Sequence, residues 1–145
     1  MPTPDGAEVR FTEDGGCFGC SQTNPSGLRM RFRRRGEGVH AAYTVADQFH
    51  GAPGVVHGGI VATLLDEVSC VAIFALSDHW VVTGEITVRY ERACPVDAAL
   101  EMSARVADRS HPRYWVVEGA IHAGGERVAR STGKFFLRDH SPIAP

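Results

Sequence analysis

The sequence lacks the features that mark several large classes of protein. It has no excess of basic residues, since its formal net charge is −2. This argues against a general nucleic-acid binder, whose phosphate contacts usually need a surplus of Lys and Arg. No stretch approaches the roughly 20 unbroken apolar residues of a membrane span, and the start MPTPDGAEVR lacks the basic and then apolar layout of a signal peptide. We therefore expect a soluble, cytoplasmic protein without nucleic-acid or membrane partners.

Cysteine is also scarce. Four residues, Cys17, Cys20, Cys70 and Cys94, are too few and too unevenly spaced for a secreted disulfide scaffold. Cys17 and Cys20 form a CxxC pair, which raises zinc or redox chemistry. A structural zinc site needs four ligands, however, and the sequence offers no second CxxC and no spaced pair of histidines. We predict no metal site and interpret the pair as part of an N-terminal cap over the sheet.

What is present predicts one globular domain. The 145 residues, 43% of them hydrophobic and 22% charged, suffice for a sizeable core. Residues 1–15 are polar and residues 139–145 end the chain with a proline-rich stretch, so we expect a tail at each end of a single domain at 16–138. No internal repeat or low-complexity segment interrupts that domain.

Alternation of apolar and polar residues predicts an antiparallel sheet with one wet face. In LRMRFRR, the apolar Leu28, Met30 and Phe32 alternate with arginines, and VHAAYTV follows after a turn. Four later segments are read as strands: 85–91, 100–106, YWVVEGAIHA and RVARSTGKFFLR, the last two joined at Gly124-Gly125. The other face of the sheet needs a cover, and one long helix between the second and third strands supplies it. Open edge strands favour pairing with a second copy.

An acidic pair lies inside the most apolar part of the chain, GAPGVVHGGIVATLLDEVSCVAIFAL. On a helix from Gly58 to Leu76, Asp66 lies opposite a broad apolar arc and among small residues. The arc consists of Ile60, Val61, Leu64, Leu65, Val68, Val71, Ala72, Ala75 and Leu76, and the opposite face of Gly59, Ala62, Asp66, Ser69 and Ile73, with Thr63 and Cys70 at its margin. Glu67 lies about 100° further round, towards the boundary of the arc. A mid-helix acid is ordinarily solvated, but its small neighbours make Asp66 a candidate acid, base or nucleophile.

The start of the helix adds a second candidate element. The first backbone N–H groups of a helix lack partners and carry the positive end of its dipole, so they can hold an oxyanion. Glycines at 58 and 59 would let a substrate carbonyl approach those groups. The alternative is a flexible loop before the helix, which Gly51, Pro53 and Gly54 alone would explain.

The segment VVHGGIVATLLDE resembles the signature of the hotdog-fold acyl-CoA thioesterases, in the PaaI-like group of the 4-hydroxybenzoyl-CoA thioesterase superfamily. A His-Gly-Gly opens the central helix, and an acid follows nine residues after the His. The resemblance extends from CFGCSQTNPSGLRMRF through VVTGEITVRYERACP to the final strand. It implies an α+β hotdog fold, in which a curved antiparallel sheet of about five to six strands wraps around one long central helix.

The resemblance also assigns roles to four residues. Asp66 takes the role of nucleophile or general base, and the N–H of Gly58 polarises the thioester carbonyl, with Gly59 adjacent. His57 corresponds to a histidine that orients the substrate, although a lone histidine can equally be a structural hydrogen-bonding residue. Thr83 corresponds to a hydroxyl that orients the attacking water, although Thr is also an ordinary strand former.

One position departs from the family pattern. Related enzymes often have Asn or Gln about six residues before the motif histidine, whereas this chain has Gly51, preceded by His50. Either His50 takes over the contact or the site lacks it. The run at 33–35, Arg89 or Arg92 could meet the phosphates of coenzyme A, although exposed strand ends are commonly charged.

The implied reaction is hydrolysis of an acyl-CoA to a carboxylic acid and free coenzyme A. Coenzyme A is part of the substrate, and no separate cofactor is required. Two other functions stay open on the same fold: a non-catalytic acyl-CoA binding or sensing protein, and an enoyl-CoA hydratase. The family forms homodimers, often assembled into homotetramers, with active sites at the dimer interface. Asp66 and Thr83 are expected from one chain, and His57 and Gly58 from the other.

Overall fold

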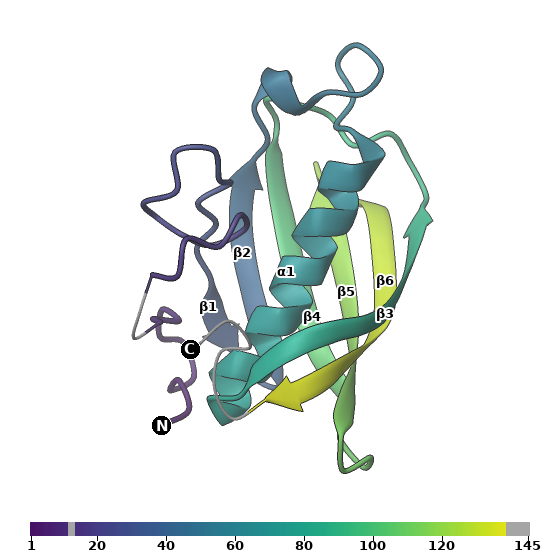
Figure 1. Ribbon diagram of the computed structural model, residues 1–145. Helices are drawn as coiled ribbons and strands as arrows, with labels where there is room; N and C mark the ends of the chain where they lie inside the picture. Colours follow the sequence, from purple (N-terminus) through teal and green to yellow (C-terminus); the bar gives the residue numbers. More distant parts are fainter. Residues whose placement is uncertain (12–13, 139–145) are drawn as a thin grey trace.

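One curved antiparallel sheet wraps a long helix in the computed structural model, which describes residues 1–11 and 14–138 (Figure 1). The helix is α1, Gly58–Ser77, and a short 3-10 helix, η1, spans Asp47–Phe49. The strands are β1 Arg33–Arg35, β2 Gly38–Thr44, β3 Trp80–Tyr90, β4 Ala99–Asp108, β5 Tyr114–Ala123 and β6 Glu126–Arg138. Their order across the sheet is β1-β2-β4-β5-β6-β3. The hotdog fold predicted from the sequence is confirmed.

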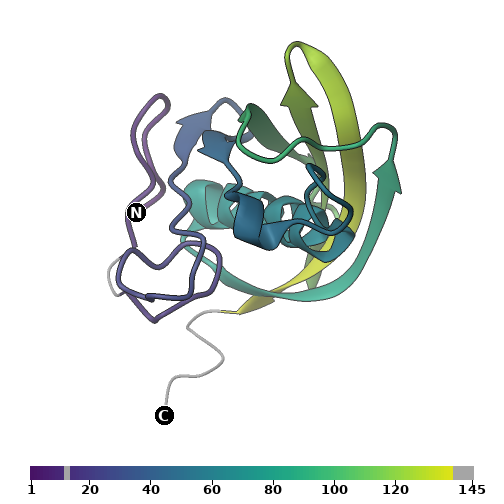
Figure 2. The same cartoon turned by 90° about the horizontal axis from the view of Figure 1, so that it is seen from above.

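The long helix is buried on more sides than a simple two-face pattern predicts. Ser69 and Ile73 were expected beside Asp66 on the exposed face, but both are wholly buried, whereas Ile60 of the predicted apolar arc is partly exposed. The sheet curves around α1, and the N-terminal segment packs against another side of it (Figure 2). Ser69 tolerates burial because its hydroxyl donates to the Leu65 carbonyl at 2.7 Å.

The predicted first strand forms a ladder only at its end. Leu28, Met30 and Phe32 are buried as the alternation predicted, but β1 begins at Arg33. Arg29 lies in the left-handed region with φ 57°, which interrupts extended pairing. The N–H groups of Leu28 and Met30 instead donate to carbonyls of residues 18 and 19. The segment is therefore bonded to the CxxC loop rather than to the sheet.

The N-terminal segment lies against α1. The N–H of Thr3 donates to the Ala75 carbonyl at 2.8 Å, and the Phe11 ring centroid lies 4.9 Å from that of Phe74. Much of what was expected to be a polar tail thus contacts the domain, and the CxxC pair, expected to cap the sheet, contacts α1 instead. The physical reason is that the sheet leaves this side of the helix open (Figure 2). The predicted C-terminal tail, 139–145, lies outside the described residues.

The two edges of the sheet differ in length. β1 has 3 residues and pairs only with β2, whereas β3 has 11 residues and pairs only with β6. The predicted turn between β5 and β6 is confirmed, with φ 57° at Gly124 and 80° at Gly125. By length and composition alone, α1 would also suit a membrane span, a criterion that the core helix of a soluble protein meets as well.

Candidate functional site

Asp66 and Thr83 form a hydrogen-bonded pair between α1 and β3. The Thr83 hydroxyl donates to Oδ1 of Asp66 at 2.6 Å, and both residues are partly buried. A register shift follows Thr83, where Gly84 sits without a ladder partner between Thr83 and Glu85. Burial raises the pKa of Asp66, and the hydrogen bond from Thr83 opposes that rise. Within the described part of the chain, Oδ2 of Asp66 meets no hydrogen-bond donor, so the carboxylate keeps one free oxygen in a site of reduced solvation.

Cys70 extends this pair and was not assigned a role from the sequence. Its Sγ lies 3.7 Å from Oγ1 of Thr83, and burial raises the pKa of the Cys70 thiol, which keeps it protonated. The Thr83 hydroxyl donates its hydrogen bond to Asp66, so in the contact with Cys70 the thiol is the donor and the Thr83 oxygen the acceptor. The three groups thus form a chain of hydrogen bonds that ends on the carboxylate. The spacing of four residues between Asp66 and Cys70 was the available sequence signal.

The start of α1 presents one unpaired backbone donor. His57 is the N-cap, and its Nδ1 accepts the N–H of Gly59 at 2.9 Å. The neutral ring therefore carries its proton on Nε2. Among the described residues, the N–H of Gly58 meets no acceptor. Of the two glycine N–H groups expected to hold an oxyanion, the one at Gly58 is available and the one at Gly59 is engaged by His57.

Tyr90 fixes the helix start against β3. Its hydroxyl donates to the Gly58 carbonyl at 2.6 Å, although the side chain is 52% exposed. A pocket of about 350 Å³ opens beside this contact, with walls that include Val56, Val61 and Cys94. From the sequence, Tyr90 was predicted only as part of the strand at 85–91. Its contact with the helix start depends on where β3 ends, which residue spacing does not reveal.

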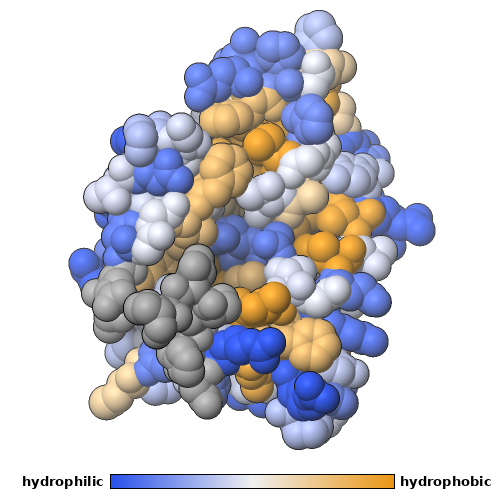
Figure 3. All heavy atoms as spheres, in the orientation of Figure 1, coloured by the Kyte–Doolittle hydropathy of each residue, from blue (hydrophilic) through white to orange (hydrophobic). Residues whose placement is uncertain are grey.

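The unpaired N–H of Gly58 and the carboxylate of Asp66 are far apart within one chain. Eight residues of helix, at about 1.5 Å each, separate Gly58 from Asp66 by about 12 Å along the axis. A carbonyl group that accepts from the Gly58 N–H therefore lies beyond reach of the Asp66 carboxylate of the same chain. In the orientation of Figure 1, the face of the molecule carrying α1 and β3 shows apolar side chains between polar ones (Figure 3). Val82 and Tyr90 of β3 are exposed large apolar residues.

A family model decides the relationship of this chain to known proteins. The model described as "Thioesterase superfamily" matches residues 53–129, from the loop before α1 into β6. The chain belongs to the thioesterase superfamily. The resemblance stated from the sequence is thus confirmed. A comparison with curated proteins finds no match.

Solved structures of other superfamily proteins share the fold. A thioesterase superfamily protein is 26% identical with a TM-score of 0.70, covering 79% of this chain and 56% of its own. This chain thus spans little more than half of that relative. A hypothetical thioesterase from Streptococcus pneumoniae TIGR4, solved with coenzyme A, is 22% identical with a TM-score of 0.68, covering 74% and 87%. A putative thioesterase from Ralstonia eutropha JMP134, described as phenylacetic acid degradation-related, is 22% identical with a TM-score of 0.68, covering 75% and 85%.

The position that departs from the superfamily pattern seen in the sequence is closely packed. A Cβ at Gly51 would lie 3.2 Å from Cα of His57, which is tighter than ordinary contact. The N–H of Gly51 donates to the Val55 carbonyl at 2.8 Å. His50 Nδ1 lies 2.6 Å from the carbonyl oxygen of Asp47. Both Gly51 and His50 therefore lie near the helix start, and neither is placed at Asp66 of the same chain.

Arg89 lies on a different surface. It lines a groove of about 670 Å³ together with Arg105, Arg130 and Thr87. The structure thus does not bring Arg89 to Asp66 within one chain. The groove is basic enough to attract an anion, but Glu118 and Glu37 also line it.

The second acid of the helix contacts the CxxC pair. Cys17 Sγ lies 3.5 Å from Oε1 of Glu67, and one ligand atom from each of Cys17, Cys20 and Glu67 lies within 4.8 Å of the other two. Burial, first of all, raises the pKa of Glu67 to about 8. The hydrogen bond between the thiols lowers the pKa of Cys17 to about 5 and raises that of Cys20. Asp66 and Glu67 thus serve two separate clusters, as their helical positions predicted. The sequence did not predict that Glu67 would meet the cysteines.

Proposed function

We propose that this protein hydrolyses an acyl-CoA thioester to a carboxylic acid and free coenzyme A. The observation that carries the proposal is the Asp66–Thr83 pair, a carboxylate of raised pKa with one oxygen free, on the helix whose first N–H, at Gly58, is unpaired. Ester hydrolysis needs both a base or nucleophile and a donor for the developing oxyanion. Superfamily membership supports the reaction class.

The Asp66–Thr83 pair and the Gly58 N–H can act on one substrate only if two chains contribute to one site. The 12 Å or so between Gly58 and Asp66 within a chain prevents either from completing the site alone. Two copies of α1 packed antiparallel, and crossing near Ala62, would set Asp66 of one chain opposite Gly58 of the other, and β3 has a free edge for sheet pairing. We therefore infer a homodimer with two equivalent sites, and a tetramer is compatible with the same pairing.

The chemistry follows from the donor and acceptor roles of each group. The thioester carbonyl accepts from the Gly58 N–H, where the helix dipole favours negative charge. Asp66 attacks the carbonyl carbon, or removes a proton from a water that does so. The Thr83 hydroxyl donates its hydrogen bond to Asp66, so the Thr83 oxygen can accept a hydrogen bond from such a water. The coenzyme A thiolate then leaves. In the route by direct attack, water next hydrolyses the mixed anhydride formed on Asp66, which releases the carboxylic acid and restores the carboxylate. His57 Nε2–H is a donor available to orient the substrate.

Similar solved structures support coenzyme A as the thiol part of the substrate. The Streptococcus pneumoniae protein was solved with coenzyme A, and smu.793 from Streptococcus mutans UA159 was solved bound to acetyl CoA. Mutants of the former with an aspartate or a threonine replaced by alanine have also been solved, the two residue types that are paired here. These names support acyl-CoA as the substrate class for this chain.

The test is release of free thiol from a panel of aliphatic, aryl and hydroxylated acyl-CoAs. We expect Asp66→Asn to lower kcat by about 10²- to 10⁴-fold, the usual contribution of a positioned general base, without loss of assembly. Glu101→Gln, an exposed acid-to-amide change on β4, is the matched control and should behave like the wild type. Wild-type turnover in Asp66→Asn would remove Asp66 from the mechanism. Acyl-CoA binding without thiol release, or hydration of crotonyl-CoA, would replace hydrolysis with one of the other two functions.

A further inference from the structure

The loop that contains Cys17 and Cys20 meets α1 at Glu67, on a side of the helix that hydrolysis does not use. Glu67 is partly buried, and its side-chain contacts in the described part of the chain are with the two thiols rather than with a Lys or Arg. A buried carboxylate is costly unless a cation or strong donors compensate its charge. Two thiols and one carboxylate from distant parts of the chain thus converge without a protein cation.

The spacing of the three ligand atoms suits a tetrahedral ion. Zn–S bonds of about 2.3 Å and Zn–O bonds of about 2.1 Å place sulfur and oxygen about 3.6 Å apart around one zinc. Cys17 Sγ lies 3.5 Å from Oε1 and 3.8 Å from Oε2 of Glu67. All three ligand atoms lie within 4.8 Å of one another, so the arrangement needs only a small contraction to hold an ion.

The backbone around the cysteines donates a hydrogen bond to a cysteine sulfur, as is usual where a thiolate binds a metal ion. The N–H of Gly19 donates to Cys17 Sγ at 3.3 Å, a contact that stabilises a sulfur carrying negative charge. Gly19 also permits the close approach to the helix, because a Cβ there would lie 2.5 Å from Cδ of Glu67. A larger residue at position 19 would therefore displace the Glu67 carboxylate from its place beside the two cysteines.

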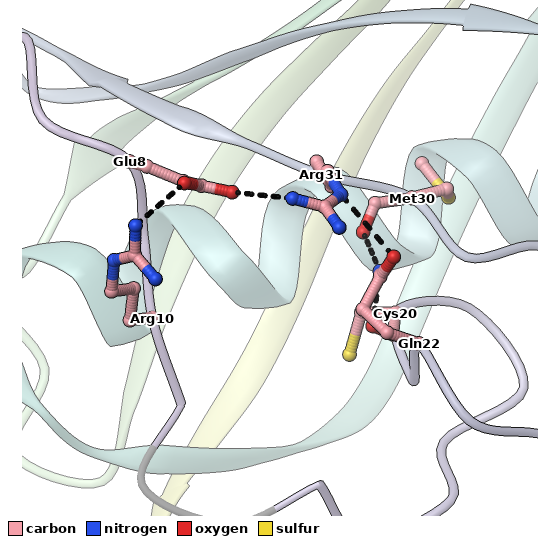
Figure 4. Close-up of polar contacts among 6 residues, drawn as sticks. All are labelled: Glu8, Arg10, Cys20, Gln22, Met30 and Arg31. Atoms are coloured by element: carbon pink, nitrogen blue, oxygen red, sulfur yellow. Dashed lines mark hydrogen bonds and ion pairs between the residues drawn. The ribbon is translucent and has the colours of Figure 1, made fainter.

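The loop is also held rigidly before any ion arrives. The Gln22 amide donates to the carbonyls of Cys20 at 3.1 Å and Met30 at 3.2 Å, and its oxygen accepts from Arg31 at 3.2 Å (Figure 4). Arg31 continues to Glu8 at 3.3 Å, which ties the loop to the first part of the chain (Figure 4). A preorganised loop lowers the entropic cost of assembling ligands.

We propose that Cys17, Cys20 and Glu67 bind a divalent transition-metal ion of zinc type, with a water molecule as the fourth ligand. Two soft sulfur ligands and one carboxylate favour Zn²⁺ over Mg²⁺ or Ca²⁺, which prefer oxygen alone. Each thiol binds as thiolate and Glu67 as carboxylate, so any protons that these groups hold are released to solvent. The ion links the N-terminal segment to α1 one residue from Asp66. This departs from our expectation from the sequence, because Glu67 lies 47 residues beyond Cys20 and no ligand spacing indicates it.

The experiment uses the full chain, stripped with a chelator and kept reduced with a phosphine. Zn²⁺ is titrated against a chromophoric chelator, and Co²⁺ is used as a spectroscopic probe. We expect one ion per chain, an intense visible Co²⁺ spectrum typical of tetrahedral coordination, and a near-ultraviolet charge-transfer band from two thiolates. Cys17→Ser and Cys20→Ser should each halve that band. Glu67→Gln should keep both thiolates and weaken binding by more than the roughly 10- to 100-fold typical of an outer-shell partner.

Cys94→Ala is the matched control, since Cys94 is a cysteine outside the cluster, and it should bind like the wild type. A Zn²⁺ affinity no greater than that of the Cys17→Ser/Cys20→Ser double variant would overturn the proposal. A Zn²⁺ affinity unchanged in Glu67→Gln would do the same for the three-ligand site, and so would wild-type protein that gives an octahedral Co²⁺ spectrum. If Glu67→Gln fails to fold, the Co²⁺ spectrum of the wild type still decides the geometry and the number of thiolates. None of these readouts depends on thioester hydrolysis.

Discussion

The backbone N–H of Gly58 can be removed without removing the helix. Proline is the only substitution that deletes this donor, and Gly58 is the first residue of α1, the position where proline is best tolerated. The preceding residue, His57, has ψ 135°, which is the extended conformation that a following proline requires. A Cβ at Gly58 would lie 3.7 Å from the Tyr90 ring, an ordinary van der Waals contact. Gly58→Pro is therefore expected to fold.

The expected loss is that of one oxyanion donor. Such a deletion costs about 10²- to 10³-fold in kcat, or about 2.7–4 kcal/mol of transition-state stabilisation. Gly58→Ala separates this effect from steric obstruction, because it adds a Cβ at the same place and retains the N–H. We expect kcat for the proline variant to be at least about 30-fold below that of the alanine variant, with similar thermal unfolding curves for both.

The assay is thiol release from the best acyl-CoA, with kcat and KM determined separately, and thermal unfolding followed by circular dichroism. A loss confined to KM would mean that Gly58 binds the ground state and transition state equally. Equal kcat values for Gly58→Pro and Gly58→Ala would refute the reasoning that places the oxyanion at this N–H.

Two further predictions concern the acid and the assembly. Thr83→Val removes the hydrogen bond that lowers the Asp66 pKa and leaves the burial that raises it, so the acid limb of the kcat/KM profile should move to higher pH. Activity requires ionised Asp66, so it is lost as pH falls through the Asp66 pKa. The control is Thr87→Val, on the same strand but away from Asp66, which should show the wild-type acid limb when both variants carry equal amounts of metal. An acid limb that does not move in Thr83→Val would contradict the pairing of Thr83 with Asp66. Mixed assemblies of Asp66→Asn and Gly58→Pro chains should regain about one quarter of wild-type activity, because half of the dimers are mixed and each has one intact site. No recovery in verified mixed dimers would show that both groups act within one chain.

Periodicity was sufficient to predict the main elements but not their surroundings. The helix, five of the six strands and the Gly124-Gly125 turn followed from local alternation and turn chemistry, which act within a few residues. The ladder of Leu28 to Phe32 did not form, because those N–H groups bond to a loop ten residues earlier. The local pattern of apolar and polar residues does not show whether a segment will bond to a distant loop or to a neighbouring strand.

The candidate site shows the same division. Helical geometry correctly separated Asp66 from Glu67, because their directions depend only on the turn of one helix. The partners of each acid come from other elements: Thr83 was indicated by resemblance alone, and Cys17 by nothing in the sequence. Cys70 already lay at the margin of the Asp66 face in the sequence, but its contact with Thr83, and that of Tyr90 with Gly58, became visible only once the strand and helix were placed in space.

The unequal edges of the sheet limit how far this protein can polymerise. At one edge, β1 is only 3 residues long, carries three consecutive arginines, and Arg33 is already bridged by Glu8. Among the described strands, only β3 offers a long row of free backbone groups, and two copies that joined through it along its length would leave neither row free. Association through this strand is self-terminating: it yields a closed pair and leaves no second template for the open-ended stacking of chains that produces fibrils.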